Sequence, residues 1–404
     1  MSIENTIDLI PVPGIRLGTA AAGINKPGRQ DLVLIEIAPE GSCAGVYTRN
    51  AFCAAPVLLA REHQAQAGPH YLLVNSGNAN AGTGEQGMQD ALACCQAVAD
   101  VVGCQAVEVL PFSTGVIGER LPVQKLTAAL PQAYDNLVVS GWQTAAQAIM
   151  TTDTRPKGAS RQFVSNGVTI TVTGIAKGSG MIRPDMATML AYVATDLAVA
   201  PALLQACLEQ AVAASFNSIT VDGDTSTNDA CILMASGQAT HARVEDADSA
   251  AAQALQQAVT EVCIELAQAI IRDGEGATKF ITIEVKGGAS EEECRQVAYT
   301  VAHSPLVKTA FFASDPNWGR ILAAVGRAGI DGLDVSQVQI YLDEVGIVSA
   351  GGRDPGYTEV MGQGVMQRDE ITVRIELGRG ASQARVWTCD FSYDYVKINA
   401  EYRT

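Results

Sequence analysis

Two strand-like runs on either side of a glycine-rich stretch constrain this chain most. The runs cover residues 167–175 and 188–195, and residues 177–190 read Lys-Gly-Ser-Gly-Met-Ile-Arg-Pro-Asp-Met-Ala-Thr-Met-Leu. Thr188 therefore opens a buried strand, and because it is β-branched, its side chain has few rotamers. A hydroxyl held so stiffly is placed to attack the carbonyl carbon of Ala187, immediately before it in the chain.

Cleavage of the Ala187–Thr188 bond would give Thr188 a free α-amino group. The pKa of such an amine is about 7.7–8.0, so it can act as the base for the side-chain oxygen of the same residue. An Ala-Thr pair alone is far more often the plain start of a strand. The longer stretch and the rest of the chain must therefore decide between the two interpretations.

Composition and charge exclude several classes of function. The 404 residues are 48% hydrophobic and 17% charged, which predicts a large core and two or three domains. The net charge of −16 argues against nucleic acid or an anionic membrane surface as a partner. The N-terminal residues are polar and no run of 18 apolar residues exists, so we expect a cytoplasmic protein.

The sequence contains no pattern typical of a metal site. The ten cysteines include no C-x-x-C pair, and the four histidines are dispersed, so no zinc spacing appears. Asp222, Asp224 and Asp229 resemble a calcium loop, but the glycine and the closing glutamate are not at EF-hand positions. We expect no metal and no resident cofactor.

A glycine-rich loop gives the chain a rival interpretation. Gly82, Gly84 and Gly87 follow a strand at 71–74 and precede a helical pattern, and Glu108 lies about twenty residues further on. This is the order of a dinucleotide-binding fingerprint. However, the first glycine lies about seven residues beyond the strand, and the asparagines around it favour a hydrogen-bonded turn. A dehydrogenase remains a distant alternative.

A short hydroxyl-glycine corner could supply an oxyanion hole. A strand at 107–110 leads to Ser-Thr-Gly at 113–115, and a corner of this kind leaves the Thr114 hydroxyl and the Gly115 N–H free to point the same way. Taken alone, such a pair is far more often only a turn.

Several stretches together resemble the ornithine acetyltransferase (glutamate N-acetyltransferase) family, in the family's order. They cover residues 75–87, 113–115, 150–154, 177–190, 217–229, 274–279, 314–320 and 399–404, essentially the whole chain. The resemblance implies self-cleavage between Ala187 and Thr188 and a ping-pong transfer of acetyl from N2-acetyl-L-ornithine through Thr188 to L-glutamate. It also implies an oxyanion hole at Thr114 and Gly115. The implied substrate contacts are Thr151, Lys177, Thr188, Glu275, Asn399 and Thr404.

The family's fold is an αββα-type layered α/β core, similar in logic to the N-terminal nucleophile enzymes. It implies an α chain of residues 1–187 and a β chain of residues 188–404, associated as α2β2. We expect residues 188–284 to complete the core and residues 285–404 to form a smaller C-terminal lobe. Acetyl-CoA as a second donor, in a bifunctional enzyme, stays open. Arg403 departs from the family pattern beside Thr404 and bears on acceptor choice.

Two further alternatives remain. A related self-processing amidase or aminopeptidase would use water as the acceptor, although those relatives typically have serine as the nucleophile. A binding protein that has kept the fold without the activity would stay uncleaved and would transfer no acetyl group.

Overall fold

The computed structural model describes residues 7–24, 28–183 and 189–401, and these fall into two compact units. The first unit comprises Met1–Gly178, Arg183–Asn217 and Thr225–Ile270. The second comprises Ser179–Ile182, Ser218–Asp224 and Ile271–Thr404. The second unit thus begins near residue 271, earlier than the boundary at 285 expected from the sequence, and it includes two short segments from earlier in the chain.

The first sheet of unit 1 has the strand order β1-β2-β4-β5. Its strands are β1 (Ile15–Ala20), β2 (Leu32–Ile37), β4 (Tyr71–Asn78) and β5 (Val109–Val116). The pairs are antiparallel except β4 with β5, which are parallel. A parallel pair needs a crossover connection, and α2 (Gly84–Val102) supplies it. The helices α1 (Ala55–Gln66), α3 (Val123–Asp135) and α4 (Trp142–Ala148) complete this half.

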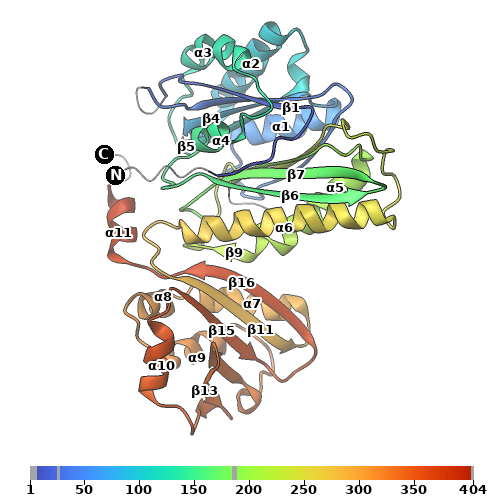
Figure 1. Ribbon diagram of the computed structural model, residues 1–404. Coiled ribbons are helices and arrows are strands. Elements are labelled where there is room, and N and C mark those ends of the chain that lie inside the picture. Colours follow the sequence, from blue (N-terminus) through green and yellow to red (C-terminus); the bar gives the residue numbers. More distant parts are fainter. Residues whose placement is uncertain (1–6, 25–27, 184–188, 402–404) are drawn as a thin grey trace. The chain divides into compact units, whose positions relative to one another are not determined.

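The second sheet of unit 1 has the order β3-β10-β8-β7-β6. Its strands are β3 (Ser42–Tyr47), β6 (Lys157–Ser165), β7 (Val168–Lys177), β8 (Leu190–Thr195) and β10 (Ala230–Ala235). Strands β6 and β7 form an antiparallel hairpin that turns at Asn166 and Gly167. The helices α5 (Pro201–Ala214) and α6 (Ala250–Arg272) accompany this sheet, and α6 runs along its outer side (Figure 1).

The two sheets of unit 1 pack face to face around one apolar core. Ile35, Val74 and Phe112 from the first sheet share a buried cluster with Tyr192 and Ile232 from the second. The rings of Phe112 and Tyr192 meet edge to face with centroids 5.5 Å apart. Helices α2 and α3 cover the other face of the first sheet through a separate buried cluster (Figure 1). The expected αββα layering is confirmed.

Unit 2 is built on a seven-stranded sheet with the order β14-β13-β12-β15-β11-β16-β9. Its strands are β9 (Ile219–Thr220), β11 (Phe280–Gly288), β12 (Gln339–Leu342), β13 (Val345–Ser349), β14 (Gly352–Arg353), β15 (Glu370–Glu376) and β16 (Ser382–Cys389). Its helices are α7 (Glu291–Ala302), α8 (Pro305–Phe312), α9 (Trp318–Gly326), α10 (Glu359–Met366) and α11 (Tyr393–Ala400).

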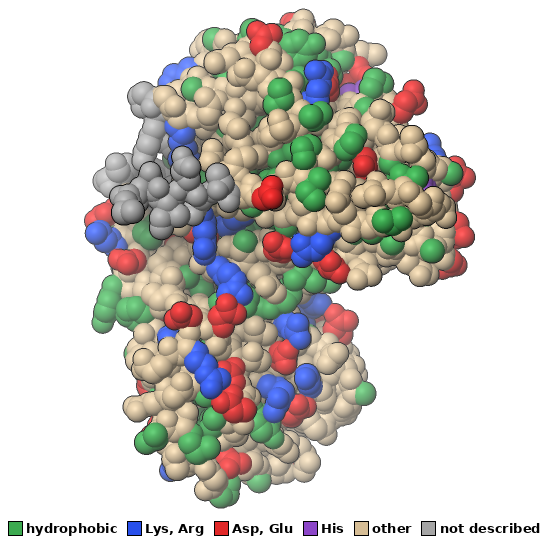
Figure 2. Space-filling model, viewed as in Figure 1, with side chains coloured by type: hydrophobic (Ala, Val, Ile, Leu, Met, Phe, Trp, Pro, Cys, Tyr) green, Lys and Arg blue, Asp and Glu red, His purple; other side chains and the backbone are tan. Residues whose placement is uncertain are grey.

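The two faces of this sheet differ in chemistry. Helices α7, α8 and α9 bury one face in an apolar cluster that includes Val297, Phe311 and Ile321. Charged side chains of opposite sign gather over the strands of unit 2 (Figure 2), where Arg385 pairs with Glu284 at 2.6 Å. In the described part of the chain, no helix has both the length and the hydropathy to span a bilayer.

Candidate active site

Lys177 and Thr114 meet at the ends of two strands from different sheets of unit 1. Lys177 is the last residue of β7, and Thr114 lies near the end of β5. The Lys177 ammonium donates to Thr114 Oγ1 at 3.0 Å, and the Thr114 side chain is buried. An ammonium group only donates hydrogen bonds, so the hydroxyl proton of Thr114 must point to another acceptor. The contact orients Thr114 as a donor, as an oxyanion hole requires.

Gly115 follows Thr114 in a backbone conformation that requires glycine. Its φ is +135°, and a Cβ at this position would lie 2.3 Å from the carbonyl carbon of Gly77 in β4. The sequence suggested a corner after a strand ending at residue 110. That suggestion was wrong, because β5 continues to Val116 and both site residues belong to it. The close approach of β4 and β5 therefore sets the backbone at Gly115.

Asp153 ties together the backbone around Lys177. Its carboxylate pairs with Lys157 Nζ at 2.6 Å, and both side chains are buried. It also accepts from Gly178 N at 2.7 Å and from Thr151 N at 3.0 Å. Burial alone would raise the pKa of Asp153, but the charges of Lys157 and Lys177 and these hydrogen bonds together lower it. Asp153 is thus an ionised buried group that positions Thr151 and the residue after Lys177.

The strand β8 begins directly opposite Lys177. Lys177 pairs with Leu190 in the antiparallel ladder of β7 and β8, and the carbonyl oxygen of Met189 accepts from Ala230 N at 3.0 Å. Ala187 and Thr188 lie outside the described residues.

Asn228 supports the backbone before Thr114. Its amide Nδ2 donates to the carbonyl oxygen of Ser113 at 2.9 Å and to that of Ala79 at 2.5 Å. The Ser113 hydroxyl in turn donates to Asn75 Oδ1 at 2.6 Å. The three side chains and the carbonyl groups they bond are buried, so the peptide that leads into Thr114 is held from two sides.

Asp229, the residue before β10, is a buried carboxyl with an unused oxygen. Its Oδ2 has no hydrogen-bond partner within the part of the chain that the structure describes. Burial raises the pKa of Asp229 well above its usual value, while hydrogen bonds from Ser226 and the charge of Lys177 oppose the rise. Asp229 therefore keeps its proton over a wider pH range than an exposed aspartate.

In unit 2, Glu275 meets Asn399. Asn399 Nδ2 donates to Glu275 Oε2 at 2.9 Å and to the carbonyl oxygen of Tyr395 at 3.0 Å. Glu275 is buried, yet within the described ranges it forms no ion pair. The third contact expected in this unit, Thr404, lies outside the described residues, as does Arg403.

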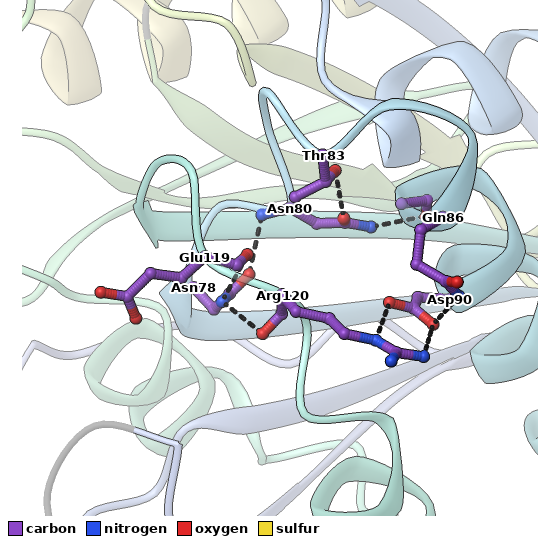
Figure 3. Close-up of polar contacts among 8 residues, drawn as sticks. Asn78, Asn80, Thr83, Gln86, Asp90, Glu119 and Arg120 are labelled. Atoms are coloured by element: carbon purple, nitrogen blue, oxygen red, sulfur yellow. Dashed lines mark hydrogen bonds and ion pairs between the residues drawn. The ribbon is translucent and has the colours of Figure 1, made fainter.

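In the asparagine- and glycine-rich loop after β4, polar side chains form hydrogen bonds with the loop's own backbone (Figure 3). Asn78 Oδ1 accepts from Asn80 N at 2.8 Å, and Asn80 Nδ2 donates to the Gly87 carbonyl oxygen at 2.9 Å. A Cβ on Gly87 would lie 2.0 Å from Thr83 Oγ1. Gly87 is needed because the Thr83 side chain lies against it. This observation gives the dinucleotide interpretation no support. Because β4 extends to Asn78, Gly82 also follows the strand more closely than the sequence suggested.

Metal ligands do not gather at either cluster. In the residues that can be described, no group of three His, Cys, Asp or Glu side chains is arranged to hold a metal ion. Asp222 and Asp229, which the sequence places in one calcium-like loop, belong to different units. All ten cysteines are free thiols.

The chain was compared with known proteins, and the sequence matches span nearly all of it. A family profile described as the ArgJ family matches residues 16–404. The arginine biosynthesis bifunctional protein ArgJ of Methylococcus capsulatus is 64% identical over 398 residues, which cover 98% of this chain and 97% of that protein. The protein of the same name from Pseudomonas syringae pv. tomato is 59% identical over 396 residues, 98% of each. The crystal structure of argJ from Bacillus halodurans matches with a TM-score of 0.50 and 37% identity, over 53% of this chain and 99% of that chain.

Proposed function

The chain belongs to the ArgJ family, and from that premise we propose that it is a self-processing N-acetyltransferase. It moves an acetyl group from N2-acetyl-L-ornithine to L-glutamate, in arginine biosynthesis. The observation that carries this proposal is the hydrogen bond from Lys177 Nζ to Thr114 Oγ1 at 3.0 Å. It joins two family-motif residues at the strand end where β8, the strand after Thr188, begins.

The first half-reaction forms an ester on Thr188. Its Oγ attacks the acetyl carbonyl carbon of N2-acetyl-L-ornithine, and its α-amine takes the hydroxyl proton. The Thr114 hydroxyl and the Gly115 N–H donate to the developing oxyanion, where the loss of one donor typically costs about 2.7–4 kcal/mol. When the C–N bond breaks, the proton passes to the leaving amine and L-ornithine departs.

The second half-reaction reverses these steps with L-glutamate. Its amine attacks the acetyl-Thr188 carbonyl carbon, the same two donors bind the oxyanion, and the threonine oxygen leaves with a proton. One site serves both substrates in turn. For N2-acetyl-L-ornithine, Lys177 is suited by charge to the carboxylate and Glu275 to the side-chain ammonium group. Thr151, Asn399 and Thr404 are the further contacts.

Self-cleavage at Ala187–Thr188 would leave two interlocked chains. Strand β7 belongs to residues 1–187 and pairs from Val172 to Lys177 with β8 from residues 188–404. An α2β2 assembly and a cytoplasmic location complete the proposal. So does acetyl-CoA as a second donor, since the relatives are named bifunctional.

The decisive experiment compares the wild type with Thr188→Ala by denaturing mass analysis and by an acetyl-ornithine plus glutamate assay. We expect two fragments meeting at 187/188 and full transfer in the wild type, and one intact, inactive chain in the variant. Thr169→Ala, at an exposed position in β7, is the matched control and should cleave normally. A single chain in the wild type that still transfers acetyl would refute the proposal. Hydrolysis of the donor without transfer to glutamate would favour an amidase.

A further inference from the structure

Asp222 forms hydrogen bonds with a short segment, Ser179–Ile182, that precedes the expected cleavage point, whereas Asp222 itself follows it. Its carboxylate accepts from Met181 N at 2.7 Å and from Ile182 N at 2.9 Å. It also accepts from Asp224 N at 3.2 Å, which fixes the loop on which it lies. One carboxylate thus holds two successive backbone N–H groups of the segment Ser179–Ile182, and all of these residues belong to unit 2.

The carbonyl side of the same segment is held as well. The Ile182 carbonyl oxygen accepts from Val221 N at 2.8 Å and from Thr220 Oγ1 at 2.9 Å. The Thr220 hydroxyl also lies 3.0 Å from His303 Nε2, at the end of α7. Ile182 itself is buried. The loop Ser218–Asp224 therefore binds both the donors and the acceptor at this end of the segment.

The other end of the segment lies against Glu275. Glu275 N donates to the Ser179 carbonyl oxygen at 2.8 Å. A Cβ on Gly180 would lie 2.4 Å from Glu275 Cδ and 2.4 Å from its Oε2. Only a glycine permits this approach, so the position of the Gly180 backbone limits where the Glu275 carboxylate can go. Asn399 limits the same carboxylate from another side.

We propose that Asp222 is a positioning residue that fixes Ser179–Ile182 against Glu275 and thereby shapes the subsite for the side-chain ammonium group of the ornithine substrate. The inference rests on the proposed function for the role of Glu275. Under that function, Ser179–Ile182 belongs to the N-terminal fragment, whereas Asp222, Glu275 and Asn399 belong to the C-terminal one. The subsite is then assembled from both products of cleavage, and Asp222 keeps it assembled once the covalent link is gone.

The test uses two substitutions of graded severity. Asp222→Ala removes both acceptors. Asp222→Asn keeps one oxygen that can accept from Ile182 N. It places an NH2 group opposite Met181 N, and because both groups are donors, that hydrogen bond is lost. We expect amide exchange at both positions to speed up in the alanine variant. The KM for N2-acetyl-L-ornithine should rise about tenfold, as for the loss of about 1.4 kcal/mol of binding, with kcat within about twofold of the wild type. The asparagine variant should be intermediate.

Asp224→Asn is the matched control, because it makes the same charge change two residues away on an exposed side chain. It should leave exchange, KM and kcat as in the wild type. Gly180→Ala is a second, independent variant. It leaves the Asp222 contacts in place but forces the Glu275 carboxylate to move, so it should raise KM without faster exchange at Met181 and Ile182.

Three results would overturn the proposal. The first is faster exchange at the two amides of Asp222→Ala with an unchanged KM. The second is a KM in Gly180→Ala equal to that of the wild type. The third is a fall in kcat together with a rise in KM and a loss of cooperative unfolding in both Asp222 variants. That result would make Asp222 a structural residue only. A wild type that transfers no acetyl group would instead contradict the proposed function, and the exchange measurement would still report on the Asp222 contacts.

Discussion

Two buried carboxylates, Asp153 in unit 1 and Glu275 in unit 2, are held in opposite ways. Asp153 pairs with the buried ammonium of Lys157 at 2.6 Å and accepts two backbone N–H groups. Glu275 is equally buried, yet within the described residues its carboxylate accepts a hydrogen bond from the neutral amide of Asn399. Removing a charge from water costs several kcal/mol unless a partner compensates it. The chain itself supplies that partner for Asp153, and we infer that a ligand supplies it for Glu275.

The two carboxylates also differ in what fixes their position. Asp153 connects strand ends, because it holds Lys157 at the start of β6 and Gly178 just after β7. Glu275 lies on the loop between α6 and β11, and its partner Asn399 lies on α11, a helix without a buried residue. A site fixed by the hydrogen bonds of a β-sheet resists conformational change, whereas a site fixed by loops can adjust its conformation to a ligand. The comparison predicts that stability depends on the first carboxylate and binding on the second.

The largest effect on stability should come from Asp153→Asn. The substitution leaves the Lys157 ammonium buried without a charge partner, so the free energy of unfolding should fall by about 3–5 kcal/mol at pH 7. The lowered pKa of Asp153 means that its stabilisation is present above the unfolded pKa of about 3.9 and is lost as the pH falls below it. Urea unfolding at pH 7 and pH 3 measures both. Glu261→Gln, which breaks the exposed pair with Arg161, should cost at most about 1 kcal/mol. Equal losses in the two variants would remove the distinction.

Glu275→Gln should show the reverse pattern. The amide can still accept from Asn399, so the free energy of unfolding should change by less than about 1 kcal/mol. Binding should suffer, because a hydrogen bond to a charged group contributes about 1.5–3 kcal/mol. We expect a ten- to hundredfold higher dissociation constant for L-ornithine, measured by calorimetry. Glu284→Gln in β11, which loses its pair with Arg385, is the control and should bind normally. Unchanged ornithine binding in Glu275→Gln would show that Glu275 does not face the ammonium group.

The elements with strong local signals were predictable from the sequence. The hairpin of β6 and β7 follows from alternation around an Asn-Gly turn, and α6 is rich in alanine, the strongest helix former. By contrast, α11 was missed because none of its residues is buried, so no apolar periodicity marks it. The helix α1 was missed because its apolar and polar residues are not clearly separated onto two faces, so its sequence shows little helical periodicity.

The site was predictable only as far as its motifs reach. The motifs named Thr114 and Lys177, but the hydrogen bond that joins them spans 63 residues of sequence and depends on the packing of two sheets. Asp153 stood inside a matched motif from which only Thr151 was taken. Its role appears once Lys157 and Gly178 converge on its carboxylate, and no local pattern encodes that convergence.

Asp229 offers a third way of burying a carboxyl group, which is to leave it protonated, and at pH 5 its replacement by asparagine should have the smallest effect on stability. Because its pKa is raised in the folded state, the folded chain keeps a proton that the unfolded chain releases above about pH 3.9. The stability of the wild type should therefore decline as the pH rises from there toward the folded pKa. Asp229→Asn carries no such proton, so it should match the wild type within about 1 kcal/mol at pH 5.

The pH dependence of that variant tests the comparison most finely. Between pH 5 and pH 8, Asp229→Asn should gain stability relative to the wild type, by up to about 1.4 kcal/mol for each pH unit below the folded pKa. Urea unfolding at several pH values measures the trend, with Asp135→Asn at an exposed position as a control that should show none. A relative loss of stability with rising pH would mean that Asp229 is ionised and paired with Lys177. It would then be held as Asp153 is, and the two carboxyl groups would share one cation.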